Sequence, residues 1–423
     1  MTHSPQTLLR ELFDVAIAAA DPATCIAPHM PSPPAGRTLL ISAGKAAASM
    51  ARAFEREWPR DASLSGIALT RYGHGLDCER IKVIEAAHPV PDNRGEQAAR
   101  AIMKEVKALT EEDLLVFLVS GGGSALMTLP VDGISSADKQ AINTALLRSG
   151  APIGDMNTVR KHLSAIKGGR LAQAAQPARV VTLAISDVPH DDPSTIASGP
   201  TVPDPTMLAD VSRLIARYDL PVTEAMRQHL VRADAETPKP GDPVFNNTEF
   251  HLVATPGMMI HKVEEQIRYL GLDVVNLGAD LEGEAREVGC AHADMALQKQ
   301  RDGFRGLIIS GGETTVTLAP GIKGRGGRNG EYLLGFAART DGAPSIHALA
   351  CDTDGIDGSE TNAGAIYGPD TVRHATANGW DAKKALDAHD AYGFFQSVDA
   401  LIETGPTLTN VNDFRAIWIG GDS

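Results

Sequence analysis

Two stretches of this sequence place consecutive glycines directly after an apolar run, and such turns are suited to binding phosphate. The first turn follows Leu114–Val119 and comprises Ser120, Gly121, Gly122, Gly123 and Ser124. The second follows Leu307–Ser310 and comprises Gly311, Gly312 and Glu313. In a glycine turn between a strand and a helix, backbone N–H groups can approach a phosphate closely. A flexible turn that needs positive φ is the alternative for either stretch alone, but two such junctions indicate an enzyme that handles phosphate.

A third junction carries a lysine. The apolar run Thr38–Ser42 leads into Ala43, Gly44 and Lys45, and helix-forming residues follow. The order is similar to a P-loop, but Leu39 stands where a P-loop requires its first glycine, so a Walker A motif is excluded. The helix macrodipole disfavours a cation in the first turn unless an anion lies beside it. Gly44 and Lys45 are therefore candidates for phosphate binding, with a solvated lysine as the alternative.

The clearest basic cluster of the chain lies within Asn157–Arg170. If this segment is helical, Arg160, Ser164 and Lys167 fall on one side of the helix, where they could bind a carboxylate or a phosphate. A solvated helix face that ends at the following glycine pair is the alternative. We expect Arg160 and Lys167 to bind substrate.

A second basic segment, Gly321–Glu331, contains five glycines together with Lys323, Arg325 and Arg328. The pattern predicts a mobile loop that closes over a polyphosphate and adds positive charge during phosphoryl transfer. A disordered surface hairpin is the alternative. We assign Arg328 to substrate binding, together with Asn410 of the polar loop near the C-terminus.

Three aspartates at or after the ends of predicted strands are candidates for metal binding. Asp187 follows the predicted strand Val180–Ile185, Asp192 lies in the same loop, and Asp352 follows the predicted strand Ile346–Ala350. A carboxylate at a strand end can accept a proton or hold phosphate-bound Mg²⁺. Loop aspartates also form turns and cap helices, and the strand-end position favours a functional role for Asp187 in particular.

Alternating strands and helices predict how these residues are positioned. Further strands are expected at Ile67–Thr70, Lys82–Glu85 and Leu252–Ala254, and helices at Met1–Asp21, Gly95–Leu109 and Ser136–Leu147. This alternation implies an open, mostly parallel α/β sheet. Ligands bind beyond the carboxyl ends of such strands. The Pro-rich segment Ala233–Asn247 predicts a boundary between two domains, 1–235 and 248–423.

Composition limits the classes of function. The chain has 423 residues, of which 43% are hydrophobic and 22% charged, as expected for a soluble protein with a large core. A net charge of −14 argues against a nucleic-acid or anionic-membrane surface. No segment approaches the roughly 18–20 apolar residues that span a bilayer. The N-terminus lacks the pattern of a signal peptide, and the four cysteines have no metal-type spacing. We expect a cytoplasmic protein that acts on small molecules, with a homodimer as one option for its assembly.

The ordered set of motifs resembles the class II glycerate 2-kinase family, whose C-terminal half carries the MOFRL domain and some members of which are named hydroxypyruvate reductases. The resemblance covers nearly the whole chain. It rests on I-S-A-G-K-A (41–46), H-P-V-P-D (88–92), V-S-G-G-G-S-A-L (119–126), V-R-K-H-L-S-A-I-K-G-G-R-L-A, S-D-V, A-S-G-P-T, S-G-G-E-T-T-V, G-R-G-G-R-N, T-D-G-I-D-G and T-N-V-N-D.

The resemblance implies that ATP phosphorylates the 2-hydroxyl of D-glycerate, with Mg²⁺, to give 2-phosphoglycerate. It implies an α/β fold of two domains, an N-terminal Rossmann-like, mostly parallel sheet with flanking helices and a C-terminal α/β MOFRL-type domain. Lys45 and Arg325 match the family's suspected catalytic basic residues, and Asp187 matches its strand-end acid. Gly330 and Tyr332 depart from the usual Gln and Phe, and Leu408 replaces a usual Gly, which puts local loop geometry in question.

Two other functions are weighed against this one. An NAD(P)H-dependent hydroxypyruvate reductase needs a dinucleotide fingerprint, and G-x-G-x-x-G is missing at both Ser-Gly-Gly turns. A sugar-acid or nucleotide sensor without enzymatic activity would use the same scaffold, but no DNA-binding element, zinc site or basic tail supports a regulator. The sequence therefore favours the kinase.

Overall fold

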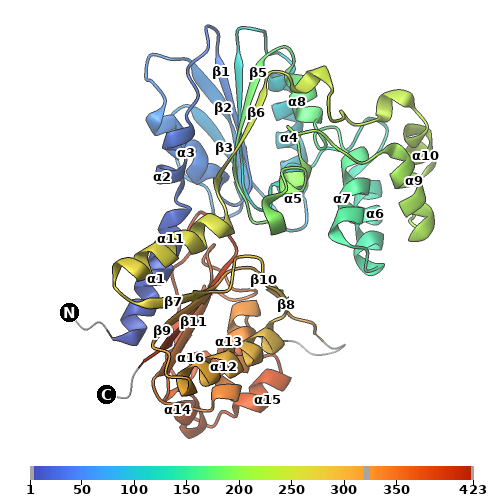
Figure 1. Ribbon diagram of the computed structural model, residues 1–423. Helices are drawn as coiled ribbons and strands as arrows, with labels where there is room; N and C mark the ends of the chain where they lie inside the picture. The colour runs from blue at the N-terminus through green and yellow to red at the C-terminus, as the bar shows by residue number, and fades with distance from the viewer. Residues whose placement is uncertain (1–3, 319–323, 421–423) are drawn as a thin grey trace. The chain divides into compact units, whose positions relative to one another are not determined.

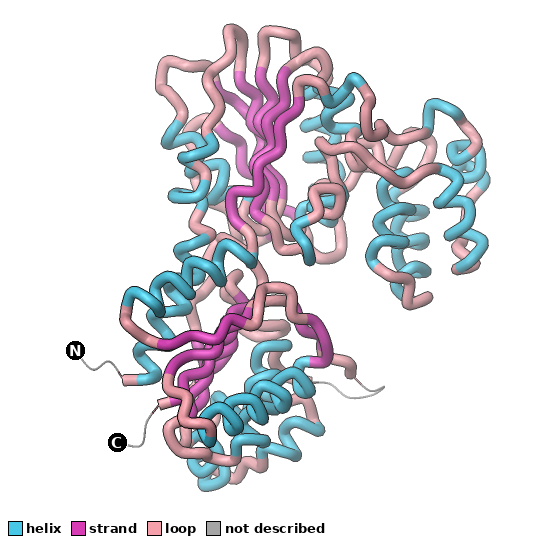
Figure 2. The backbone as a smooth tube through the Cα atoms, in the orientation of Figure 1, coloured by secondary structure: helices cyan, strands magenta, loops and turns pink. Residues whose placement is uncertain are grey.

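The computed structural model describes residues 4–318 and 324–420, which form two compact units (Figure 1). Residues 22–253 make the first, called here the N-terminal unit. Residues 4–21, 254–318 and 324–420 make the second, called here the C-terminal unit. Each unit contains a sheet flanked by helices (Figure 2). The α/β class predicted from the sequence is thus confirmed.

The N-terminal unit is built on a six-stranded sheet of order β3-β2-β1-β4-β5-β6. The strands are β1 Thr38–Ala43, β2 Leu64–Arg71, β3 Ile81–Ala86, β4 Leu114–Val119, β5 Arg179–Ile185 and β6 Thr248–Ala254. Neighbours among β1 to β5 pair in parallel. Every residue of β1 and β4 is buried, as expected for central strands covered on both faces. This strand order is that of dinucleotide-binding folds, in which the order of strands reverses between β1 and β4 and ligands bind at that switch point.

Helices of the N-terminal unit fall into a group that flanks the sheet and a group beside it (Figure 1). The first group and the short helices near it are α2 Pro22–Cys25, α3 Ala47–Glu57, α4 Asn93–Val106, α5 Gly123–Leu126 and α8 Arg170–Ala175. The second group is α6 Ser136–Arg148, α7 Ile153–His162, α9 Leu208–Arg217 and α10 Glu224–Leu230. The second group has its own small apolar core, which includes Ile142, Val159 and Val211. Single 3₁₀ turns lie at Ala27–His29, Pro189–Asp191, Ile196–Ser198, Ala233–Ala235 and Pro243–Phe245.

The C-terminal unit is built on a mixed sheet of order β13-β12-β11-β14-β9-β7. The strands are β7 Asp273–Asn276, β9 Gly306–Ser310, β11 Ile346–Asp352, β12 Gly364–Tyr367, β13 Leu401–Ile402 and β14 Asp413–Ile419. A separate two-stranded ribbon pairs β8 Glu282–Glu284 with β10 Glu313–Thr315. Because β14 is antiparallel to both β9 and β11, the start of β14 lies beside the ends of β9 and β11. Ser310, Asp352 and Asp413 therefore lie at the same end of these three strands.

Helices cover both faces of this mixed sheet (Figure 1). One face carries α1 Pro5–Ala19 and α11 Pro256–Tyr269, and the other carries α12 Ala285–Arg301 and α13 Arg328–Thr340. The remaining helices are α14 Thr371–Ala377, α15 Ala382–Asp387 and α16 Ala391–Gln396. None of the helices in the described ranges is both long enough and apolar enough to cross a bilayer.

The two units differ from the expected ranges 1–235 and 248–423 at two places. Helix α1 packs in the C-terminal unit, where the ring of Phe13 stacks on that of Phe414 at 6.2 Å between centroids. Strand β6 lies at the edge of the N-terminal sheet, where the N–H of Val180 donates to the carbonyl of Asn247 at 2.9 Å. Both differences arise from packing between distant segments, which a composition-based boundary does not detect.

We predict that Phe13→Ala destabilises the C-terminal unit by about 3 kcal/mol. Phe13 is 2% exposed on the apolar face of α1, so its loss leaves a cavity against Phe414. The free energy of unfolding measured in urea tests this. The matched control is Tyr269→Ala, because Tyr269 is 85% exposed and its loss leaves no cavity. Equal effects of the two substitutions would contradict the docking of α1.

Candidate functional site

The turns that follow β1 and β4 are joined to one another at the switch point of the N-terminal sheet. The N–H of Ser120 donates to the carbonyl of Ala43 at 3.1 Å, and the N–H of Lys45 donates to the carbonyl of Gly121 at 2.8 Å. The N–H of Ala46 donates to Ser120 Oγ at 3.0 Å. The structure therefore brings together the two turns that the sequence had marked separately.

Two glycines permit this close approach. Gly44 has a φ of +134°, and a Cβ there would lie 2.2 Å from Ser120 Oγ. Gly122 has a φ of +82°, and a Cβ there would lie 2.9 Å from His88 Nε2 and 3.4 Å from Lys45 Cγ. A side chain at Gly44 would collide with the backbone of Ser120, whereas one at Gly122 would be strained by the positive φ and would displace the His88 side chain. The side chains of His88 and Lys45 consequently lie against the glycine turn.

The glycine turn offers backbone donors. In the described part of the chain, the N–H groups of Gly121 and Gly122 donate to no protein acceptor, whereas the N–H of Gly123 donates to the carbonyl of Ser120 at 3.2 Å. The helix that follows, α5, is a single turn of four residues, so the donors themselves matter more than a helix macrodipole. Two unsatisfied N–H groups beside Lys45 form an arrangement that fits an anion.

Lys167 is anchored beneath the same turn. Its side chain is 2% exposed, and its ammonium donates to the carbonyl of Ser124 at 2.6 Å and to Ser124 Oγ at 2.9 Å. Ser124 Oγ in turn lies 2.8 Å from Ser198 Oγ. Burial, followed by the positive charges of Lys139 and Arg160, lowers the pKa of Lys167 well below its usual value. Lys167 therefore fixes the end of the glycine turn.

The predicted helix through Arg160, Ser164 and Lys167 is wrong. Helix α7 ends at His162, and the chain then turns through Gly168 and Gly169, whose φ angles are +58° and +80°. Arg160 stays on α7, where its Nε donates to Asn143 Oδ1 at 3.1 Å. The helix has ended before Ser164, whose Oγ donates to the carbonyl of Leu129 at 3.2 Å, and the N–H of Ala165 donates to the same carbonyl at 2.9 Å.

The loop after β5 also reaches the glycine turn. Ala197 and Ser198 have φ angles of +49° and +62°, a conformation that is costly for residues other than glycine and that concentrates at functional sites. The methyl group of Ala197 would lie 3.1 Å from a Cβ placed on Gly123. This loop therefore closes over the turn, although sequence reasoning did not select Ser198 or His88. Both residues stand in the motifs A-S-G-P-T and H-P-V-P-D, which were the available signal.

The two aspartates of this loop have different surroundings. Asp187 is partly buried just beyond β5. The carboxylate of Asp192 accepts from the N–H of Ser194 at 2.9 Å and from the hydroxyls of Ser194 and Thr195 at 2.8 and 3.0 Å. Burial raises the pKa of Asp192, but these hydrogen bonds outweigh it and lower the pKa. Asp192 thus forms a turn, and the catalytic and metal-binding roles of both aspartates stay predictions.

In the C-terminal unit, Arg328 is the centre of an ion-pair cluster. Its guanidinium contacts Glu313, lies 3.0 Å from Asp352 Oδ2 and lies 2.9 Å from Asp413 Oδ1. Burial alone would lower the pKa of Arg328, but the charges of Asp413, Asp352 and Glu313 outweigh it and raise the pKa. Arg328 opens α13, so residues 328–331 are helical and the loop predicted over Gly321–Glu331 is wrong for its last part.

The second Ser-Gly-Gly turn is bound into this cluster. Arg415 donates to the carbonyl of Gly311 at 2.9 Å and to Asp413 Oδ2 at 2.6 Å. Gly312 has a φ of +102°, and a Cβ there would lie 2.2 Å from the carbonyl of Leu281. Packing therefore explains Gly312, and a Cβ on Gly311 would lie 3.2 Å from Ala279 Cα. The turn presents carbonyl and carboxylate acceptors. Phosphate binding by Gly311, Gly312 and Glu313 stays a prediction.

Asp357 caps the helix that carries Arg328. Its carboxylate accepts from the N–H groups of Asn329 at 3.0 Å and Gly330 at 2.8 Å. Burial raises the pKa of Asp357 to about 6, against the opposing effect of these two hydrogen bonds. A Cβ on Gly330 would lie 3.2 Å from the methyl group of Ala391. The departure from Gln at this position is therefore matched by close packing of the first turn of α13.

Two other departures have local explanations. Leu408 has a φ of +62°, a left-handed conformation that favours the glycine usual in the family. The Tyr332 hydroxyl lies 2.8 Å from His292 Nδ1, a contact that phenylalanine could not make.

Asn410, a predicted substrate-binding residue, is 4% exposed, and its Oδ1 accepts from the N–H of Asn412 at 3.2 Å.

Arg325 is held at the surface of the C-terminal unit. Its Nε lies 3.1 Å from Glu360 Oε1, and its guanidinium lies over the Tyr392 ring at 4.5 Å. Its N–H donates to the carbonyl of His389 at 2.8 Å. The chain is thus tethered from Arg325 onward, whereas Lys323 lies outside the described residues.

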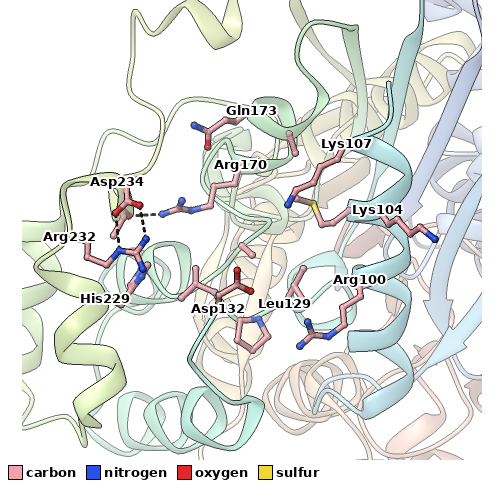
Figure 3. A pocket seen from close by; sticks show the side chains of 16 residues that line it. Arg100, Lys104, Lys107, Leu129, Asp132, Arg170, Gln173, His229, Arg232 and Asp234 are labelled. Atoms are coloured by element: carbon pink, nitrogen blue, oxygen red, sulfur yellow. Dashed lines mark hydrogen bonds and ion pairs between the residues drawn. The ribbon is translucent and has the colours of Figure 1, made fainter. Parts of the chain in front are cut away.

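Neither a cluster of metal ligands nor a pocket marks the position of the candidate site. Among residues 4–318 and 324–420, no group of three or more His, Cys, Asp and Glu side chains could hold a metal. A pocket of about 740 Å³ lies in the N-terminal unit. Figure 3 shows Arg100, Lys104 and Lys107 on one side of it, opposite Arg170 and the Arg232–Asp234 ion pair. None of the predicted site residues lines this pocket, so the candidate site is placed by backbone donors and charge.

Comparison with known proteins agrees with the motifs. A family model described as a domain of unknown function, DUF4147, matches residues 8–231, and the MOFRL family model matches residues 306–413. A glycerate 2-kinase of Pyrococcus horikoshii is 38% identical over 386 residues, covering 89% of this chain and 86% of the relative. The crystal structure of glycerate kinase from Thermotoga maritima superposes with a TM-score of 0.89 at 34% identity, covering 97% of this chain and 98% of that one. The chain belongs to the class II glycerate kinase family. An Agrobacterium vitis protein provisionally named hydroxypyruvate reductase is 50% identical, covering 99% of this chain and 95% of the relative.

We predict that His292, which is hydrogen-bonded to Tyr332, makes the stability of the protein depend on pH. Burial, and next the charge of Arg415, lowers the pKa of His292 to about 4, against about 6.5 in an unfolded chain. Neutral His292 therefore makes its full contribution to the free energy of unfolding above pH 6.5. About 3 kcal/mol of that free energy is lost as the pH falls toward 4. The free energy of unfolding should fall less between pH 7 and 4 in His292→Gln than in the wild type.

Urea unfolding at a series of pH values measures this difference. His261→Gln is the control, because the side chain of His261 is 73% exposed. Identical pH dependence in the wild type and His292→Gln would show that His292 is not held neutral.

Proposed function

We propose that the protein transfers the γ-phosphoryl group of ATP to the 2-hydroxyl of D-glycerate and releases 2-phosphoglycerate. The observation that carries the proposal is the pair of unsatisfied N–H groups of Gly121 and Gly122 beside Lys45, at the switch point of the sheet. The names of the relatives, glycerate 2-kinase and glycerate kinase, support the acceptor.

The reaction follows from the chemistry of these groups. The 2-hydroxyl oxygen attacks the γ-phosphorus, the bond from that phosphorus to the β–γ bridging oxygen breaks, and the bridging oxygen leaves with ADP. We assign the hydroxyl proton to the carboxylate of Asp187, because a strand-end carboxylate can accept it. Gly44, Lys45 and the turn Ser120–Ser124 hold the phosphates, and Arg325 adds positive charge.

A magnesium ion fits this arrangement. Magnesium is usually held by one or two carboxylates together with substrate phosphates, and it keeps several waters. Asp187 is the first choice for that carboxylate because it follows the carboxyl end of β5. Asp192 is engaged by three donors of its own loop, and Asp352 by Arg328 and by the N–H of Asp354 at 3.0 Å. When bound, Mg²⁺ would neutralise the charge of the β- and γ-phosphates.

Substrate contacts are proposed at four further residues. Arg160 and Lys167 supply positive charge beside the glycine turn. Arg328 supplies a guanidinium that contacts three carboxylates of the C-terminal unit, and we propose that it also binds substrate. Asn410 offers an amide from the loop that precedes β14.

A hydroxypyruvate reductase is the second candidate, because one relative carries that name at 50% identity. The turn after β1, which bears the fingerprint in dinucleotide-binding folds, reads Gly44-Lys45-Ala46-Ala47-Ala48-Ser49 and lacks the second and third glycines. Incubating the protein with ATP, Mg²⁺ and D-glycerate and identifying the product by ³¹P NMR tests the kinase. NADH oxidation with hydroxypyruvate, measured in parallel, tests the reductase. Activity only in the second assay would overturn the proposal.

We predict that Lys45→Ala and Arg325→Ala each lower kcat by on the order of 10²-fold or more. Each would remove a cation that stabilises the transferring phosphoryl group. Steady-state kinetics beside circular dichroism measures the loss in folded protein. Lys262→Ala and Arg373→Ala are matched controls, because each removes an exposed cation paired with one surface carboxylate. A near-normal kcat in either test variant would refute the catalytic role of that residue.

We predict that Gly122→Val raises the KM for ATP strongly while the protein stays folded. A side chain there would push against His88 and Lys45 and block the approach of a phosphate to the backbone. Gly133→Val is the control, because Gly133 has a φ of +88° and nothing lies within 4 Å of a Cβ placed on it. If both variants retain wild-type kinetics, the glycine turn does not bind phosphate.

A further inference from the structure

Three cations of the N-terminal unit interact beside the glycine turn. Lys139 lies on α6, Arg160 lies on α7, and Lys167 follows in the turn after α7. Lys139 is 5% exposed and Lys167 is 2% exposed. The positive charge of Arg160 acts on both lysines, and that of Lys139 acts on Lys167. The three are called here the cation cluster.

The members of the cation cluster differ in their hydrogen-bond partners. Lys167 donates to Ser124, and Arg160 donates to Asn143. In contrast, Lys139 Nζ is buried and has no hydrogen-bond partner in the described part of the chain. Burying an ammonium without a partner is unfavourable because the charge loses its hydration, so this position needs an explanation.

Among the described residues, no carboxylate forms a hydrogen bond with Lys139. Glu96 of α4 is the acid whose charge acts on Lys139. Its Oε1 accepts from Arg100 at 2.6 Å, and its Oε2 accepts from the hydroxyl of Ser136. The cation cluster thus carries an excess of positive charge within a chain whose net charge is −14. An external anion would remove this imbalance.

We propose that Lys139, together with Arg160, binds the carboxylate of the acceptor acid. The inference rests on the proposed function and adds a residue that the motifs do not contain. The phosphate already has donors in Gly121, Gly122 and Lys45. The cation cluster adjoins the same turn through the bond from Lys167 to Ser124. An acid held by its carboxylate at the cluster would therefore be close to the phosphate end of the turn.

The charge state of Lys139 provides a readout that a purely structural role would not move. Burial, and next the charge of Arg160, lowers the pKa of Lys139 to about 8, against the opposing effect of Glu96. The charged groups that face it are thus Arg160 of α7 and Glu96 of α4, with Lys167 beyond them. Carboxylate binding needs the ammonium form, so the KM for D-glycerate should rise as the pH passes 8, while the KM for ATP should not.

The experiment compares Lys139→Met, which keeps the length of the side chain without its charge, with Lys139→Arg, which keeps a charge. Lys104→Met on the exposed side of α4 is the control. We expect Lys139→Met to raise the KM for D-glycerate about tenfold or more, to leave the KM for ATP within about twofold, and to abolish the rise above pH 8. Lys139→Arg should restore most of the affinity.

Three results would overturn the inference. They are an unchanged KM for D-glycerate in Lys139→Met, an increase confined to ATP, which would place the nucleotide at the cluster, or a flat KM for D-glycerate between pH 7 and 9.5 in the wild type. The last result decides the matter even if Lys139→Met does not fold. Two measurements separate the proposed function from the role of Lys139. If the wild type forms no phosphoglycerate in the ³¹P NMR assay, the proposed function is refuted. If calorimetric titration with D-glycerate alone shows equal binding by the wild type and Lys139→Met, the role of Lys139 is refuted.

Discussion

The turn after β1 can lie directly against the turn after β4 because Gly44 has no side chain, and the rest of the candidate site depends on this contact. A Cβ at Gly44 would come within 2.2 Å of Ser120 Oγ. With the contact in place, the N–H of Lys45 donates to Gly121, and the N–H groups of Gly121 and Gly122 remain without protein acceptors in the described part of the chain. The strand order puts this junction at the switch point of the sheet. The anion donors are thus a consequence of how the two turns pack.

The two Ser-Gly-Gly turns show that one sequence signal can lead to opposite electrostatics. The turn of the N-terminal unit presents N–H donors beside Lys45. The turn of the C-terminal unit presents a carbonyl and carboxylates that arginines occupy, namely Arg415 on Gly311 and Arg328 on Glu313. Consecutive glycines report that another backbone approaches closely. Which ligand binds depends on the groups that the approach leaves unsatisfied, and that follows only from the folded structure.

The sequence predicted the features that are set by local pattern, and missed those set by distant packing. Strands β1 and β4 could be predicted because strands buried along their whole length appear as apolar runs in the sequence. Glycines marked the turns that follow them. The docking of α1 on the C-terminal unit depends on Phe13 meeting Phe414, which no local pattern reveals. Lys139 has the appearance of a solvated lysine in the sequence of α6, because its burial depends on neighbouring helices. Of the candidate site, the sequence could therefore name Lys45 and the glycine turn, but not the cation cluster.

The central claim is that the joined turns after β1 and β4 hold the transferring phosphate. A crystal structure of the protein with a non-hydrolysable ATP analogue tests it most directly. The account predicts phosphate oxygens that accept hydrogen bonds from the N–H groups of Gly121 and Gly122, with the ammonium of Lys45 in contact with the same phosphates. Phosphates bound elsewhere, with only water on these two N–H groups, would contradict it.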